Sequence, residues 1–439
     1  MKLQAIVASL FAATAFAAGP AHAQSDAERI QDLERKLDRS MQLIERLSAR
    51  VNELERERKP VPAPPTAVPT APATPLSPAQ EARIQALEHD VTQLASSRAS
   101  AASIGGVPLH GFADVDYEHS SRPTADGRKA GFTLGNLDFY LTPSFGRVKM
   151  LGELNFEVDD EGGLATDLER LQLGYAVSDA LTAWMGRFHT PYGYWNAAFH
   201  HGAQIQTSIL RPRFIDFEDK GGVLPAHTVG LWATGHGRAG SGRFTYDAYL
   251  ANGSRIVDGI LDFNAHRDDN GNMAVGANVG YEFGGALEGL LVGLHGLRED
   301  VDAYRDGERI ARTRLAFTGG YLYLDRDYWE GIGEYYRFRN RDLDAGTTHS
   351  SWAAFLQLGR TLSERWTPYY RWERTALDAA DPYFALQEHG NSYRRHVLGL
   401  RFALNPNAAL KVEANRTREA FGEEEKSYTE ARAQFAVRF

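Results

Sequence analysis

The 439-residue chain contains 0 Cys, so no disulfide framework stabilises it. Apart from an apolar run from Leu3 to Ala18, no segment approaches the roughly twenty apolar residues that a membrane-spanning helix needs. The formal net charge is −9 and the pI is near 5.9, so no basic face is available to neutralise nucleic-acid phosphates. These absences argue against a disulfide-bonded scaffold, a helical membrane protein and a nucleic-acid-binding protein.

The first residues have the layout of a secretory signal peptide. Met1 and Lys2 precede the apolar run, and Ala21-His22-Ala23 offers a small-residue cleavage site before Gln24. We therefore expect residues 1–23 to be removed on export. The mature chain then either stays soluble or crosses a membrane as β-strands.

Two helical segments and a spacer are predicted next. Residues 24–59 predict a coiled-coil helix, because apolar residues recur at intervals of three and four, with Ser40 as a polar exception: Ile30, Leu33, Leu37, Ile44, Leu47, Val51 and Leu54. Residues 60–78 are rich in Pro, Ala and Thr and predict an extended linker. Residues 79–104 predict a second short helix. The helical part is either a solvated amphipathic helix or a self-association element. Self-association is considered because so short a row of apolar side chains buries little surface unless it pairs with another helix.

From about Leu109 to Phe439 the apolar residues recur with a period of two. Between Val148 and Val158, for example, one face is apolar and the other carries Lys149, Glu153 and Glu157, as expected for a strand between lipid and water. Seven short connections separate such segments: 142–146, 178–181, 235–242, 284–289, 325–327, 362–365 and 405–408. Seven short turns imply about eight hairpins and hence about sixteen strands.

The composition fits this pattern. The 42 Gly, 19 Tyr and 22 Phe suit turns and aromatic belts, and a mean hydropathy of −0.40 is no obstacle because a barrel shows lipid only every second residue. We predict an all-β fold, a transmembrane antiparallel β-barrel of about sixteen strands over residues 109–439, preceded by a short periplasmic coiled-coil helix.

The last strand alternates strictly and ends on an aromatic residue. Phe435, Val437 and Phe439 share an apolar face with Ala431 and Ala433, against Glu430, Arg432, Gln434 and Arg438. This resembles the C-terminal strand by which the outer-membrane assembly machinery recognises bacterial barrel proteins. The resemblance implies that Phe435, Val437 and Phe439 are an assembly signal, with the barrel assembly machinery and the lipid of a Gram-negative outer membrane as partners.

The segment from Gly186 to Gly193, with the sequence Gly-Arg-Phe-His-Thr-Pro-Tyr-Gly, resembles the point at which phosphate-selective porins of the O/P type leave a strand for their constriction loop. The layout from about Leu109 to Phe439 is similar to that family and to related dicarboxylate porins with an N-terminal coiled coil. The resemblance implies a sixteen-stranded homotrimer, in some members with arginines along the conduction path.

The longest connection, about residues 189–226, is the predicted constriction loop, because a loop of this length in a compact domain is usually functional or disordered and its aromatic residues favour order. The candidate pore residues in and beside it are Arg187, Arg211, Arg213, Asp216, Glu218 and Lys220. Asp219 brings the loop to three basic and three acidic residues from Arg211 on. The charges could form an anion filter, a transverse field across the pore, or pairs that hold the loop to the barrel wall.

A second basic group includes Arg312 and Arg314, which share a strand face opposite Leu315 and Phe317 and are therefore expected in the lumen. The region from Trp329 to Arg339 is ambiguous. Either Arg337 and Arg339 face lipid or Phe338 and Ile332 face water, and we expect a β-bulge there. We also expect Arg337 and Arg339 at the outer rim, since an arginine at the bilayer midplane costs about 2–4 kcal/mol.

The predicted function is passive diffusion of small hydrophilic solutes through an outer-membrane porin, with a modest preference for anions such as phosphate or carboxylates. The chain has no G-x-S-x-G elbow, Walker loop or H-E-x-x-H pair, and the adjacent His200 and His201 lack the spacing of zinc ligands on a helix. We therefore expect no enzyme activity, no cofactor and no metal. The alternatives are a structural anchor that links the membrane to the cell wall through the coiled coil and, least favoured, a barrel enzyme.

Overall fold

The computed structural model describes residues 103–104, 107–122, 129–158, 163–199, 203–217, 220–262, 267–422 and 424–439. The predicted signal peptide, coiled coil and linker lie outside these residues, as does the second short helix except at its last two positions. None of the described helices is long and apolar enough to cross a membrane.

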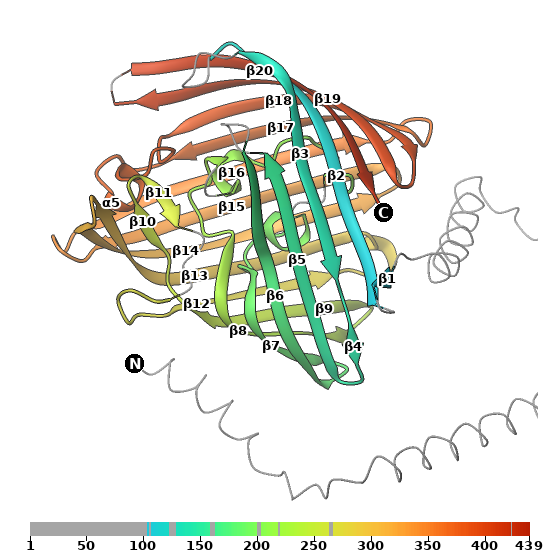
Figure 1. Ribbon diagram of the computed structural model, residues 1–439, viewed down its shortest axis with the longest axis horizontal. Coiled ribbons are helices and arrows are strands. Elements are labelled where there is room, and N and C mark those ends of the chain that lie inside the picture. Colours follow the sequence, from blue (N-terminus) through green and yellow to red (C-terminus); the bar gives the residue numbers. More distant parts are fainter. Residues whose placement is uncertain are drawn as a thin grey trace, which may run out of the picture. The chain divides into compact units, whose positions relative to one another are not determined.

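Sixteen antiparallel strands form a closed barrel (Figure 1), as the sequence predicts. They are β2 (Val107–Ser120), β3 (Ala130–Leu141), β5 (Val148–Val158), β6 (Leu164–Ser178), β7 (Leu181–His189), β8 (His227–Ala239), β9 (Gly242–Ala251), β12 (Ala274–Glu282), β13 (Leu290–Arg305), β14 (Glu308–Arg326), β15 (Trp329–Asp342), β16 (Thr348–Arg360), β17 (Trp366–Ala376), β18 (Tyr393–Asn405), β19 (Ala408–Phe421) and β20 (Glu424–Arg438).

The barrel closes where β20 pairs with β2, beginning at Phe112 opposite Arg438. At the seam Gly111 and Phe439 exchange two backbone hydrogen bonds, of 2.9 and 3.0 Å. The C-terminal residue is therefore part of the closing ladder. The side chains of Phe435 and Phe439 are exposed on the outer face, while Gln434 and Ala436 are buried, so the predicted alternation of the last strand is confirmed.

Short elements lie in the connections. β4 (Ser144–Phe145) continues β3, β1 (Ser103–Ile104) pairs with the start of β2, and β10 (Arg255–Val257) and β11 (Ile260–Asp262) form a small hairpin. The described helices are α4 (Trp195–Ala198), η1 (Arg213–Ile215), η3 (Gly285–Leu287) and α5 (Pro382–Ala385).

The two ends of the barrel differ in their connections. The seven predicted short turns lie at one end, which we call the turn end, and the long connections lie at the other, the loop end. Two connections at the loop end are also short, at two residues each: 306–307 between β13 and β14, and 422–423 between β19 and β20. In the first, Asp306 and Gly307 have φ of +54° and +80°, and Asp-Gly is the sequence that a type I′ hairpin turn favours.

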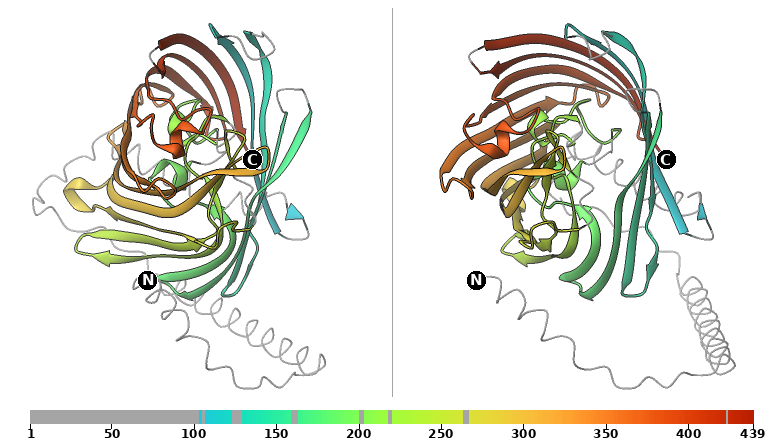
Figure 2. Two further views of the ribbon diagram at one scale, coloured as in Figure 1. Left: turned by 90° about the vertical axis from the view of Figure 1, so that its left-hand side faces the viewer. Right: turned by 60° about the vertical axis from the view of Figure 1, so that its left-hand side comes forward.

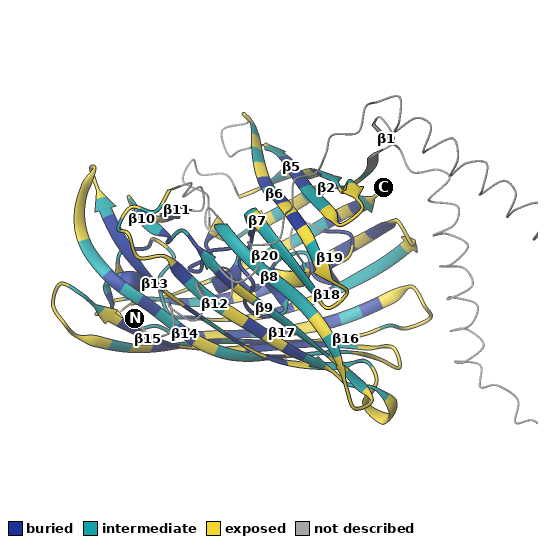
Figure 3. Cartoon of the chain, turned by 90° about the horizontal axis from the view of Figure 1, so that it is seen from below, coloured by how far each residue is buried: buried dark blue, intermediate teal, exposed yellow. Residues whose placement is uncertain are grey.

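Buried and exposed residues alternate along the strands (Figure 3), but the inner face is not uniformly polar. Leu315, Phe317, Ile332 and Phe338 are buried inside the barrel, and Phe317 contacts the ring of Tyr192 in the long loop. Apolar side chains therefore point inward wherever the loop packs against the wall.

This packing reverses one sequence assignment. Arg312 and Arg314 lie on the face opposite Leu315 and Phe317, so their predicted position in the lumen is wrong. They pair instead with Asp302 and Asp300 on β13, at 2.5 and 2.6 Å. The sequence rule that apolar residues face lipid fails here because the loop supplies an apolar surface inside the barrel.

The predicted bulge between Trp329 and Arg339 is also wrong. β15 pairs with β14 and with β16 without a register shift. Arg337 and Arg339 are exposed on the outer face, and Ile332 and Phe338 are buried on the inner face. The strand needs no bulge, because its inward apolar residues are buried rather than facing water; Phe338 packs against Phe384 of α5, with ring centroids 5.3 Å apart.

Candidate permeation site

The segment 190–226, which connects β7 to β8, folds back into the barrel (Figure 2). Its side chains Trp195, Phe214 and Ile215 are almost completely buried. Trp195 packs edge-on against Phe355 of β16, with ring centroids 5.7 Å apart, and Phe214 packs against Tyr336 of β15 at 5.1 Å. The loop thus covers the inner wall formed by these strands.

Buried wall carboxylates fix the backbone of the loop. Glu334 of β15 accepts the backbone N–H groups of Tyr194 and Trp195 at 3.0 and 2.6 Å, which are free donors at the start of α4. Glu413 of β19 accepts the N–H of Ile209 at 3.0 Å. Each contact satisfies polar backbone that would otherwise be buried unpaired.

Arg371 of β17 is the most connected wall residue beneath the loop. Its guanidinium is 0% exposed and pairs with Glu373 at 2.8 Å. It donates to Ser208 Oγ at 3.0 Å and to the carbonyl oxygens of Leu210 and Arg211 at 2.8 and 3.2 Å. One buried cation therefore joins the middle of the loop to the barrel.

The loop arginines predicted as pore residues are themselves anchors. Arg211 is buried and donates to the carbonyl oxygen of Ile215 and to Asn196 Oδ1, and it lies 3.9 Å from Asp216. Arg213 makes two hydrogen bonds to Glu419, of 2.8 and 2.9 Å. The sequence left three roles open for these charges: an anion filter, a transverse field, or ion pairs that hold the loop to the barrel wall. The contacts of Arg211 and Arg213 match the third role.

Burial and neighbouring charges shift the pKa values of charged side chains in the loop. Desolvation raises the pKa of the Asp216 carboxyl above its ordinary value, while the nearby Arg211 acts in the opposite direction. Burial alone would lower the pKa of Arg213, but its hydrogen bonds to Glu419 and the electrostatic effects of Tyr428, Glu419 and Tyr393 together outweigh burial and raise the pKa. Arg213 therefore stays protonated at every physiological pH.

The other candidates lie on or near the opposite wall. Lys220 pairs with Glu157 of β5 at 2.7 Å and remains 42% exposed, and Arg187 of β7 lies 3.5 Å from Asp167 of β6. Glu218 lies outside the described residues. The candidate charges therefore lie against two different parts of the barrel wall and do not form a single ring around the pore.

The two walls differ in how many of their inward-facing charges reach solvent. Beneath the loop, Arg371 and Glu373 are fully buried. On β20, β2, β5 and β6 the carboxylates Asp114, Glu153 and Glu169 are also buried, but five inward-facing charges keep solvent-accessible surface: Arg432 (23%), Glu118 (35%), Glu157 (27%), Asp167 (31%) and Arg170 (18%). Water therefore reaches the interior along the β20–β6 side, with the loop as the facing surface.

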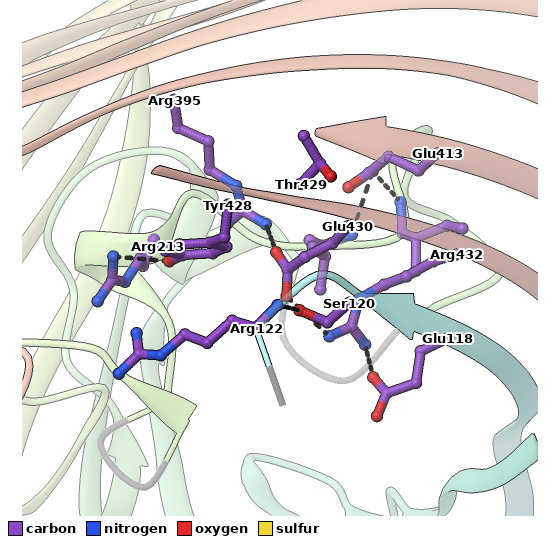
Figure 4. Close-up of polar contacts among 12 residues, drawn as sticks. Glu118, Ser120, Arg122, Arg213, Arg395, Glu413, Tyr428, Thr429, Glu430 and Arg432 are labelled. Atoms are coloured by element: carbon purple, nitrogen blue, oxygen red, sulfur yellow. Dashed lines mark hydrogen bonds and ion pairs between the residues drawn. The ribbon is translucent and has the colours of Figure 1, made fainter. Parts of the chain in front are cut away.

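Four arginines gather on this side near the loop end (Figure 4). Arg432 of β20 pairs with Glu118 of β2 at 2.9 Å, and Arg395 of β18 pairs with Glu430 at 3.1 Å. Arg213 reaches the cluster from the loop through the hydroxyl of Tyr428, at 3.2 Å. The fourth arginine, Arg122, follows the end of β2.

Arg122 is the most accessible member of this cluster, with 56% of its side chain exposed. It lies 3.7 Å from Glu419, a carboxylate that Arg213 already holds with two hydrogen bonds. Its guanidinium also lies 5.6 Å from the ring centre of Tyr428. Two arginines thus share one carboxylate, which leaves positive charge directed at the water.

Sequence reasoning missed Arg122 because it sits beyond the last regular strand residue. A signal was present: Arg122 continues the period-two series of Asp114, Asp116 and Glu118, which face inward. No group of metal-ligating side chains occurs in the part of the chain that the structure describes, and His200 and His201 lie outside it.

No family model matches the chain, and no curated protein sequence does so either. Solved structures do match. An anion-selective porin from Comamonas acidovorans has 14% identity and a TM-score of 0.54, over 76% of this chain and 99% of that chain. The outer membrane channel DcaP of Acinetobacter baumannii has 10% identity and a TM-score of 0.53, over 76% of this chain and 97% of that chain.

A loop-deletion mutant of OmpT, an outer membrane protein of Vibrio cholerae, has 12% identity and a TM-score of 0.50, over 76% of this chain and 99% of that chain. At these identities the likeness is one of fold. The chain has the sixteen-stranded fold found in bacterial outer-membrane porins.

Proposed function

We propose that this chain is an outer-membrane porin through which small hydrophilic solutes diffuse passively, with a modest preference for anions such as phosphate or carboxylates. The observation that carries the proposal is the loop 190–226, which lies inside a closed barrel and packs against one wall. The facing wall keeps solvated charges of both signs. A barrel that served only as an anchor would gain nothing from solvated charges in its interior.

The anion preference rests on Arg122, where positive charge is least compensated. A guanidinium offers planar, permanently charged donors that replace part of the hydration of a carboxylate or phosphate. Its exposure keeps the interaction weak enough for the solute to leave again. Carboxylates such as Glu118 and Asp167 on the same side keep the preference modest.

Among the residues predicted from the sequence, we propose that Arg187 and Lys220 add to the charge of the water-filled path. Arg211, Arg213 and Asp216 shape that path indirectly by holding the loop. The tight Arg213–Glu419 pair also keeps Glu419 from neutralising Arg122 fully.

The reversal potential of the purified protein in a planar bilayer under a salt gradient tests this proposal. We expect wild type to be mildly anion-selective and Arg122→Gln to move toward zero. Arg360→Gln is the matched control, since Arg360 is exposed on the outer face at the turn end and should leave selectivity unchanged. A non-selective or cation-selective wild type would refute the anion preference, and a folded protein without conductance would refute the porin function.

We further propose that the protein lies in the outer membrane of a Gram-negative bacterium, is inserted by the barrel assembly machinery and forms a homotrimer. The exposed aromatic end of β20 supports the first two points, and the resemblance of residues 186–193 to trimeric porins supports the third. Chemical cross-linking of the membrane-embedded protein should yield a ladder that ends at the trimer.

A further inference from the structure

A row of arginines crosses the outer face of the barrel near the loop end. Arg374 of β17 stands directly opposite Arg394 of β18, and Arg394 stands directly opposite Arg418 of β19. Adjacent strands lie about 4.8 Å apart, and like charges at directly opposed positions destabilise a sheet. A row of three arginines therefore calls for an anion that relieves the repulsion.

Carboxylates of the protein compensate only part of this positive charge. Glu425 of β20 approaches Arg394 at 3.2 Å and Arg418 at 3.7 Å. Arg374 instead lies over the ring of Trp352, at 5.5 Å. Among the described residues, no carboxylate lies within ion-pairing distance of Arg374 or of Arg416, which follows Ala414 along the outer face of β19.

A groove of about 390 Å³ begins beneath this row. Ala414 of β19 and Ala431 of β20 are directly opposite each other, and their small side chains leave a trough beside Leu398. At the end of the trough nearer the row lie Arg416 and His396, the latter hydrogen-bonded to the hydroxyl of Tyr370 at 2.7 Å. The groove is thus polar and cationic at its loop end and apolar below.

The outer face below the row is continuously apolar. Its exposed side chains on β16, β18, β19 and β20 are Leu356, Leu358, Leu398, Leu410, Val412 and Phe435. An occupant of the row and groove must therefore carry negative charge at the loop end and hydrocarbon toward the middle of the barrel. An amphiphile with phosphate groups and acyl chains meets both conditions.

We propose that the arginine row and the groove bind a phosphate-bearing, multiply acylated lipid of the outer leaflet. Its phosphates would lie against Arg374, Arg394 and Arg416, and one acyl chain would lie in the trough along Ala414 and Ala431. The proposal rests on the proposed location of the barrel in an outer membrane. It does not depend on conduction, because these side chains point away from the lumen.

The test uses the full-length protein in detergent and bis-phosphorylated lipid A, with retained lipid counted by native mass spectrometry. Wild type should retain lipid A, and Arg374→Gln/Arg394→Gln/Arg416→Gln should bind it at least about tenfold more weakly, since each substitution removes charge-assisted hydrogen bonds. Arg360→Gln, on the same outer face at the turn end, should bind like wild type. Dephosphorylated lipid A should bind to wild type no more tightly than bis-phosphorylated lipid A binds to the triple variant.

Three results of the binding measurements would overturn the proposal. They are equal lipid retention by wild type and the triple variant, equal binding of the dephosphorylated lipid, and binding of inorganic phosphate as tight as that of lipid A. Loss of the trimer in the triple variant with unchanged lipid retention would also overturn it and assign the row to a subunit interface. Conductance of each variant in a planar bilayer is measured in parallel, so that a failed porin function is distinguishable from a failed lipid site.

Discussion

Replacing Arg371 with Met tests how the loop is held against the barrel wall. The substitution removes the guanidinium that contacts Ser208, Leu210 and Arg211 and leaves the fully buried Glu373 without its cation. Removing one partner of a buried ion pair costs about 3–5 kcal/mol. Because the barrel ladder stays intact, we expect this cost to fall on docking of the loop, lowering its docking equilibrium by at least about a hundredfold.

Trypsin cleavage after Arg213 reports this change. In wild type Arg213 is buried against Glu419 and should resist cleavage, whereas Arg371→Met should be cut there while its heat-modifiable gel mobility still shows a folded barrel. Single-channel recordings of the variant should show larger and noisier conductance.

The double variant Arg371→Met/Glu373→Gln is the control, because it removes both charges and should regain part of the protection. A loop that stays protease-resistant in Arg371→Met, with unchanged conductance, would refute the view that this buried pair holds the loop against the wall.

Two further predictions concern the seam of the barrel. Gly111→Ala should lower the yield of folded barrel on heat-modifiable gels, because a Cβ at this position would lie 2.5 Å from the carbonyl oxygen of Asp138 and 2.4 Å from the Phe439 ring; Gly131→Ala, with open space around it, should fold like wild type. Phe439→Ala should reduce the amount of protein in the outer membrane of cells several-fold yet refold in detergent, and unchanged cellular levels would contradict an assembly role.

Strand periodicity predicted the barrel well because lipid and water impose opposite demands on alternate residues. The seven turn-end connections and the closing strand were all found from that pattern. The phase of β14 was misassigned and that of β15 was left open, because Phe317 packs against Tyr192 of the loop 190–226 and Phe338 packs against Phe384 in the β17–β18 connection. No local pattern reveals the paths of these connections. The outward position of Arg314 follows from the same packing.

The candidate site was predicted only in outline. The sequence located the loop and its charges, but it could not pair Arg213 with Glu419, which lies 206 residues away. Long-range pairing of this kind decides whether an arginine is an anchor or faces water. Arg122 gained its importance only when the structure placed it beside a carboxylate that was already occupied.

The single-channel conductance of purified wild-type protein in a planar lipid bilayer tests the central claim most directly. A solvated path between the loop and the β20–β6 wall predicts stepwise current increases that grow linearly with voltage. A protein that is folded by gel mobility and inserted in the bilayer, yet passes no current, would contradict the account.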